Sequence, residues 1–179
     1  MSRIELINPQ NTSGESKELL SQIQKAFGTT PNMFKAIANS TPALKMMWGA
    51  FGALGGGKLG TALGEQIAVA VANLNRCEYC LAAHTALGKA AGLSADVISQ
   101  AQIGKSADPK TEAALNFATK LVKERANISP DDVSSLKRAG FGDEEIAEIL
   151  AHVALNIFTN YTNVAFDVPV DFPKVALRK

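Results

Sequence analysis

Cysteine, histidine and tryptophan are scarce in this 179-residue sequence, which has two cysteines, two histidines and one tryptophan. Two cysteines are too few for a disulfide-rich secreted scaffold. Neither sign of charge dominates, because 18 lysines and arginines face 17 aspartates and glutamates for a net charge of +1. The basic residues are also spread along the chain. We therefore expect no nucleic-acid partner and no basic membrane-binding patch.

Long hydrophobic runs are also missing. The first residues lack the apolar core of a secretory signal, and the later apolar stretches are interrupted by Gly, Asn, Lys or Glu before the roughly 18 residues that a membrane helix needs. We therefore predict a cytoplasmic protein without a membrane segment. In a reducing compartment, two cysteines separated by two residues are typical of catalytic, redox-active or metal-binding sites rather than of a structural disulfide.

The pattern of apolar residues predicts an all-α protein. Hydrophobic residues make up 46% of the chain, and they recur at helical spacing, whereas runs with the period of two expected for strands are nearly absent. We predict a bundle of roughly eight helices joined by short loops, as a single domain over residues 1–179. Residues 1–60 contribute N-terminal helices, and residues 61–92 carry both cysteines. The apolar helices are too numerous for one small bundle to bury, which predicts an oligomer.

The stretch RCEYCLAAHTA holds both cysteines and one of the two histidines. Cys77 falls at the predicted start of a helix, where unpaired N–H groups and the helix dipole favour a thiolate. Cys80 and His84 are four residues apart and so share one face of that helix. Cys77 lies one turn before Cys80, within reach of a disulfide. This spacing suggests that Cys80 is the nucleophile, that Cys77 resolves its product and that His84 handles the proton.

A histidine in this role usually needs an acceptor for its second nitrogen. Glu65 is the best candidate, because a carboxylate at the head of the apolar segment IAVAVANL needs water or a partner. Tyr79 is expected to be exposed near the site and to shape access. His152 and Asn156 belong to a polar stripe that continues through positions 160 and 163. This stripe is either an exposed or interface face, or its first two members line the pocket beside the cysteines.

The pattern Glu65-x11-Cys77-x2-Cys80-x3-His84 resembles the active-site signature of the alkylhydroperoxidase D-like branch of the carboxymuconolactone decarboxylase superfamily. The flanking stretches TPNMFKAIANS and HVALNIFTNYTNVAFDVPVDFPKV resemble its peroxidase-related subgroup. The resemblance implies an all-helical fold, trimers or hexamers, and reduction of hydroperoxides. It implies a peroxidatic Cys80, a resolving Cys77 and a proton relay of Glu65 and His84. Some members have a histidine before the second cysteine, where this chain has Tyr79.

Other readings of the cysteine pair stay open. The pair could serve a redox sensor or a thiol–disulfide exchange protein without peroxidase turnover. It could also hold a structural zinc ion with His84, the fourth ligand being Glu65 or His152. The decarboxylase branch lacks the cysteine pair, which disfavours that chemistry here. We expect no cofactor beyond the redox-active Cys77–Cys80 disulfide, no bound metal, and an external dithiol or disulfide reductase as the electron donor.

Overall fold

Helices are the main regular structure in residues 2–178, which the computed structural model describes. Within that range there are nine α-helices and one short 3-10 helix, against the roughly eight predicted. None of these helices combines the length and apolar character needed to cross a membrane. The elements are η1 (Pro9–Asn11), α1 (Gly14–Phe27), α2 (Asn32–Ile37), α3 (Thr41–Gly55), α4 (Gly60–Leu74), α5 (Glu78–Ala90), α6 (Ala95–Ala101), α7 (Pro109–Lys123), α8 (Pro130–Arg138) and α9 (Asp143–Ala165).

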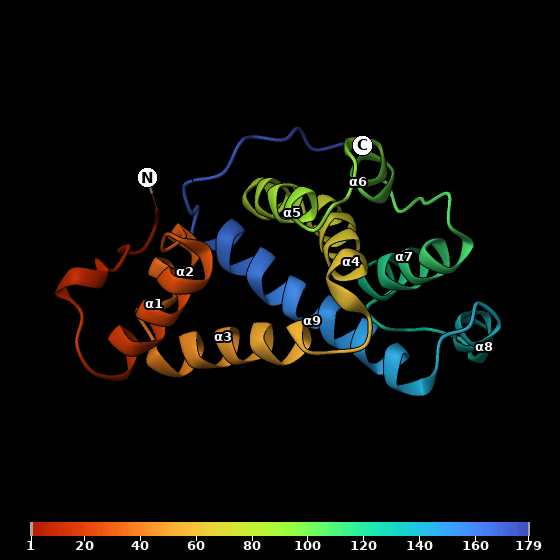
Figure 1. The fold of residues 1–179 in the computed structure, drawn as a ribbon, viewed down its shortest axis with the longest axis horizontal. Coiled ribbons are helices and arrows are strands. Elements are labelled where there is room, and N and C mark those ends of the chain that lie inside the picture. Colours follow the sequence, from red (N-terminus) through yellow and green to blue (C-terminus); the bar gives the residue numbers. More distant parts are fainter. Residues whose placement is uncertain (1, 179) are drawn as a thin grey trace.

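Helix α4 forms the centre of the molecule. It packs against α5, α7 and α9, and Figure 1 shows it among these three helices. Its residues from Gln66 to Asn73 are all buried, because this segment is apolar around its whole circumference and needs neighbours on every side. The helix reaches the protein surface only near its ends. Glu65, just before the buried stretch, is therefore held at the edge of the core.

An aromatic cluster joins the three N-terminal helices to one another. The ring of Phe34 in α2 packs edge-on against Trp48 and Phe51 of α3, with centroid distances of 5.9 and 5.8 Å. Phe27, the last residue of α1, lies 5.7 Å from Phe34. Such contacts between rings stabilise the fold beyond the burial of their area. They also give the site described below a rigid apolar wall.

The chain after α9 runs back over the molecule as an extended tail. Figure 1 shows this segment passing above α5 and ending beside α6. Main-chain and side-chain hydrogen bonds hold it in place. The amide N–H of Asn32 donates to Asp171 Oδ2 at 2.7 Å, and Gln102 Nε2 donates to the carbonyl of Ala176 at 2.8 Å. The tail therefore covers the start of α5, where both cysteines lie.

Candidate active site

The turn between α4 and α5 places Cys77 at a helix start. Arg76 adopts a left-handed conformation with φ of 57°, which reverses the chain between the two helices. Cys77 is then the N-cap of α5, and its Sγ accepts a hydrogen bond from the amide N–H of Cys80 at 3.1 Å. A sulfur thus takes the place of the oxygen that usually caps a helix. The same helix end provides the partial positive charge that stabilises a thiolate.

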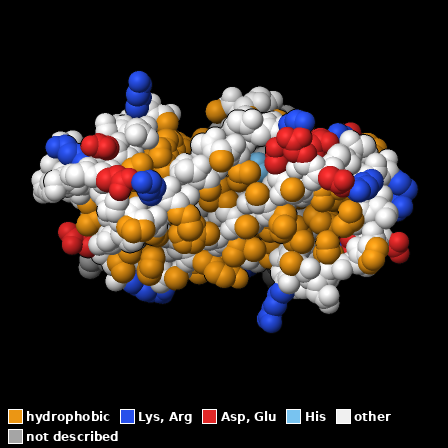
Figure 2. Space-filling model, turned by 90° about the horizontal axis from the view of Figure 1, so that it is seen from below, with side chains coloured by type: hydrophobic (Ala, Val, Ile, Leu, Met, Phe, Trp, Pro, Cys, Tyr) orange, Lys and Arg blue, Asp and Glu red, His pale blue; other side chains and the backbone are white. Residues whose placement is uncertain are grey.

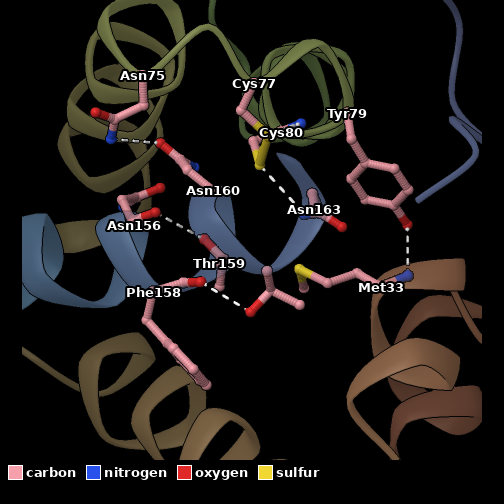
Figure 3. The surroundings of a disulfide bond; sticks show 11 residues. Met33, Asn75, Cys77, Tyr79, Cys80, Asn156, Phe158, Thr159, Asn160 and Asn163 are labelled. Carbon is pink, nitrogen blue, oxygen red and sulfur yellow. Dashed lines mark hydrogen bonds between the residues drawn. A yellow bond between two sulfur atoms is a disulfide. The ribbon is translucent and has the colours of Figure 1, made fainter. Parts of the chain in front are cut away.

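The two cysteines are joined as a disulfide, with their Cα atoms 5.3 Å apart. Cys80 is 2% exposed. Its Sγ accepts a hydrogen bond from Nδ2 of Asn163 at 3.2 Å. Figure 3 shows this side chain reaching from α9 to the sulfur. An amide donor aimed at this atom favours its charged form, so Asn163 is a second source of thiolate stabilisation at Cys80.

Asn163 is the site residue that sequence reasoning left out of its candidates. The sequence feature that could have pointed to it is its place at the end of the polar stripe on α9. The stripe lies inside the molecule, since Asn156, Asn160 and Asn163 are all buried. Asn160 accepts a hydrogen bond from Nδ2 of Asn75 at 2.9 Å, which ties α9 to the turn before Cys77. An exposed or interface face is therefore the wrong description of these three asparagines.

Glu65 and His84 meet across the packing of α4 on α5. Oε2 of Glu65 lies 2.8 Å from Nδ1 of His84, and both side chains are largely buried. A carboxylate only accepts hydrogen bonds, so the imidazole donates through Nδ1 and leaves Nε2 free. His84 also lines the same cavity as Cys80. This arrangement can take a proton on one side of the ring while the carboxylate fixes the tautomer on the other.

The cavity beside Cys80 is small and apolar. It has a volume of about 30 Å³, room for one or two water molecules. Its walls come from the aromatic cluster, from Met33 and Leu87, and from Phe172 of the tail. Cys80, His84 and Asn163 are its main polar groups. We call it the apolar cavity, and an uncharged organic group attached to a small reactive end suits its walls.

A second, more polar cavity lies on the Glu65 side of His84. Its volume is about 140 Å³, and Glu65, His84, His152 and Asn156 line it. The imidazole of His152 rests on Gly64, where an added Cβ would come within 3.0 Å of the ring. His152 and Asn156 are thus absent from the walls of the apolar cavity. The structure brings them to the carboxylate end of the Glu65–His84 pair instead of to Cys80.

Tyr79 is buried, so the prediction that it is exposed is wrong. Only 4% of the residue is accessible. Its hydroxyl oxygen accepts a hydrogen bond from the amide N–H of Met33 at 3.2 Å, and its ring packs edge-on against Phe172 at 5.7 Å. Burial raises the pKa of its phenol well above the usual range. Tyr79, which lies between the two cysteines in the sequence, therefore forms part of the cavity wall. It also ties α5 to α2 and to the tail.

Removing the amide of Asn163 should destabilise the Cys80 thiolate, because the sulfur loses its hydrogen-bond donor. Hydrogen bonds to charged groups contribute about 1.5–3 kcal/mol, so Asn163→Ala should slow oxidation of reduced Cys80 at neutral pH by at least about tenfold. The rate should recover as the pH rises and the thiol ionises unaided. The measurement is the oxidation rate against pH. Asn160→Ala is the control, because that amide contacts Asn75, and an equal loss in both variants would contradict the assignment.

His152 should make the fold less stable in mild acid. Burial lowers the pKa of this imidazole below 6.5, although Glu148 and Glu65 oppose the shift. In the unfolded chain the ring gains its proton as the pH falls through that value, while in the folded chain it does so only at a lower pH. The unfolded state then binds more protons, and the free energy of unfolding falls. Thermal unfolding above and below this pH should show a smaller drop in Tm for His152→Gln, and an unchanged drop would contradict this.

Comparisons with known proteins find a family pattern over the part of the chain that holds this site. The sequence pattern of the Carboxymuconolactone decarboxylase family matches residues 42–124, a range that includes Glu65, both cysteines and His84. No curated protein matches the chain. Among solved structures, an uncharacterized peroxidase-related protein from Silicibacter sp. TM1040 is 24% identical, with a TM-score of 0.82 over 98% of this chain and 92% of that one.

Two further structures share the fold. The alkylhydroperoxidase AhpD core of an uncharacterized peroxidase-related protein from Ralstonia eutropha JMP134 is 24% identical, with a TM-score of 0.85 over 95% of this chain and 92% of that one. The debrominase Bmp8, solved with 2,3,4-tribromopyrrole, is 20% identical, with a TM-score of 0.78 over 96% of this chain and 94% of that one. At these identities the likeness establishes the all-α AhpD-like fold.

Proposed function

Because residues 42–124 match the sequence pattern of the Carboxymuconolactone decarboxylase family, we propose that this protein is a thiol-dependent hydroperoxide reductase. One observation carries the proposal. Cys80, with its amide donor Asn163, shares a cavity with His84, whose other ring nitrogen contacts Glu65. The nucleophile, its base and the group that orients the base are thus assembled at one place. The apolar walls suit an organic hydroperoxide.

The first step is attack by Cys80 on the peroxide. His84 takes the thiol proton through Nε2, and Glu65 stabilises the imidazolium that forms. The Cys80 thiolate attacks the distal oxygen, the O–O bond breaks, and the sulfur becomes a sulfenic acid. The leaving alkoxide receives the proton from His84 and departs as an alcohol. Cys80 is oxidised by two electrons, and the peroxide is reduced by the same two.

The second step is resolution by Cys77. Its sulfur attacks the sulfenic sulfur of Cys80, the S–OH bond breaks, and hydroxide leaves as water with the Cys77 thiol proton. The product is the Cys77–Cys80 disulfide. An external dithiol then returns the pair to two thiols by exchange.

A thiol count on the purified protein tests the proposal. The protein is reduced, freed of reductant, and titrated for thiols before and after one equivalent of cumene hydroperoxide, with zinc measured on the same sample. We expect the loss of two thiols per chain and a Cys77–Cys80 link in the mass map. Thiols that do not react would contradict the proposal. Unreactive thiols with stoichiometric zinc would favour the structural zinc site, although residues 2–178 show no group of three or more His, Cys, Asp or Glu arranged for a metal.

Self-association is part of the proposal. Large hydrophobic side chains stay exposed on α3 and α9, with Met46 at 58%, Leu150 at 49% and Tyr161 at 61%. Figure 2 shows hydrophobic side chains spread over the face of the molecule seen from below. A contiguous apolar patch on the surface is typical of an interface. We expect a homotrimer or homohexamer by light scattering, and a monomer would contradict this.

A further inference from the structure

The two sulfurs of the disulfide face different openings. Cys80 lines the apolar cavity. Cys77 does not line that cavity but lies in a surface groove of about 220 Å³ between the start of α5 and the end of α9. Tyr79 and Asn163 line both spaces, so their side chains form the wall between them. We call this second opening the Cys77 groove, and its lining includes Arg76, Cys77, Glu78, Val164, Asp167 and Val170.

The Cys77 groove continues along the tail. A neighbouring hollow of about 390 Å³ shares Glu78 and Val170 with the groove and extends to Lys174. Charged residues of both signs border this path, whereas the cavity at Cys80 is lined mainly by aromatic and aliphatic side chains. Hence the two openings differ in size, polarity and the sulfur that they reach.

We propose that the Cys77 groove is the entrance for the reducing dithiol and that this dithiol attacks Sγ of Cys77. The inference rests on the proposed function, in which an external dithiol resets the disulfide. Cys77 lines the groove and is absent from the lining of the apolar cavity, whereas Cys80 lines the cavity and is absent from that of the groove. The groove, at about 220 Å³, has room for a thiol on a carbon chain, and a thiol that enters it meets the sulfur of Cys77. The hydroperoxide and the reductant therefore use separate entrances.

The exchange chemistry is consistent with attack at this sulfur. A reductant thiolate attacks Sγ of Cys77, the bond between the two cysteines breaks, and Cys80 leaves as a thiolate. The amide of Asn163 donates to the departing sulfur at 3.2 Å, and a stabilised thiolate leaves readily. The second thiol of the reductant then attacks the reductant sulfur that is bonded to Cys77. The mixed disulfide breaks, and Cys77 is released as a thiolate. Two electrons pass to the protein, and the dithiol becomes a cyclic disulfide.

The burial of Cys77 defines the kind of dithiol. The residue is 1% exposed, so the attacking sulfur has to enter the groove to reach it. A slender, flexible dithiol of small-molecule size fits this route, whereas a dithiol held flush in the surface of a folded protein does not. Dithiothreitol should therefore reduce the disulfide faster than thioredoxin at equal concentration. A faster reaction with thioredoxin would overturn the choice of a slender dithiol.

Blocking each entrance separately tests the inference. Val164 is 48% exposed and lines the Cys77 groove, so Val164→Trp should slow reduction by dithiothreitol by at least about tenfold. Its oxidation by cumene hydroperoxide should be unchanged. Ala165→Trp is the matched control, because this exposed neighbour lies outside the groove lining. Leu87→Trp, in the apolar cavity, should slow oxidation by cumene hydroperoxide and leave reduction by dithiothreitol unchanged. A Val164→Trp variant that slows both half-reactions equally, or neither, would overturn the separate entrances.

A trapped mixed disulfide identifies the attacked sulfur directly. The oxidised protein is treated with 2-mercaptoethanol, a monothiol that stops at the mixed disulfide, and free thiols are capped with iodoacetamide. Trypsin releases residues 77–89 as one peptide that holds both cysteines. Fragmentation should place the mercaptoethanol on Cys77 and the cap on Cys80, and the opposite placement would overturn the inference. Diamide can supply the oxidised protein, so thiols that ignore hydroperoxide would end the peroxidase proposal while leaving this test intact.

Discussion

Cys80→Ser should reduce hydroperoxide turnover to the rate measured without protein. A serine hydroxyl is not oxidised by a hydroperoxide, so neither the sulfenic acid nor the later disulfide can form. The measurement is consumption of cumene hydroperoxide with dithiothreitol as reductant. This is the largest effect that we expect of any single substitution, because the remaining site residues act through the Cys80 sulfur.

Cys77→Ser is the matched control for this result. It leaves Cys80 with its amide donor and with His84, so one equivalent of hydroperoxide should still be consumed. The reaction should then stop at a sulfenic acid that dimedone traps, because the resolving sulfur is missing. Full turnover by Cys80→Ser would contradict the assignment of the nucleophile. Single turnover by Cys80→Ser, with none by Cys77→Ser, would exchange the two roles.

Glu65→Gln should slow the oxidation step by about a hundredfold, at the lower end of what general acid–base catalysis contributes. Glutamine keeps the shape of the side chain and can still accept from Nδ1 of His84, but it has no charge to stabilise the imidazolium. Reduction of the disulfide by dithiothreitol should stay close to the wild-type rate, since that step uses the sulfurs and Asn163. Both rates can be followed by rapid quenching with an alkylating agent.

The same variant separates the two candidate functions. A redox sensor or a thiol–disulfide exchange protein has no need of the Glu65 carboxylate, so its reaction with hydroperoxide should not depend on that charge. Glu112→Gln is a suitable control, because this partly exposed carboxylate of α7 lies away from the site and pairs with Lys105 at 3.3 Å. An oxidation rate for Glu65→Gln equal to that of the control would remove the proton relay from the proposal.

The helical architecture and the local part of the site follow from the sequence. The contact between Glu65 and His84 was predictable because α4 and α5 are consecutive helices joined by a tight turn. The position of Cys77 at a helix start was also predictable, because the apolar helical pattern of residues 61–74 stops at Asn75 and a new helical pattern begins after it. In both cases the residues involved lie within about two helices of each other, so the geometry of a single helix pair decides their placement.

Residues brought in by distant segments could not be placed in this way. Asn163 contacts Cys80 across 83 positions of sequence, and the contact depends on how α9 packs against α5. The burial of Tyr79 depends on Phe172 and Met33, which come from the tail and from α2. The sequence left open whether His152 lines the pocket beside Cys80, because helical periodicity orders the residues along α9 and says nothing about which neighbour each one meets. The structure places His152 in the second cavity, with Glu65 and His84.

Under the proposed function, the tail after α9 separates the choice of substrates from the chemistry. It supplies Phe172 to the apolar cavity and Val170 to the Cys77 groove, yet it contributes none of the four groups that handle the electrons and the proton. Substitutions in this short segment would therefore alter which hydroperoxide enters and which dithiol follows, while the reactive centre stays the same. A chain organised in this way can acquire new partners without passing through an inactive form.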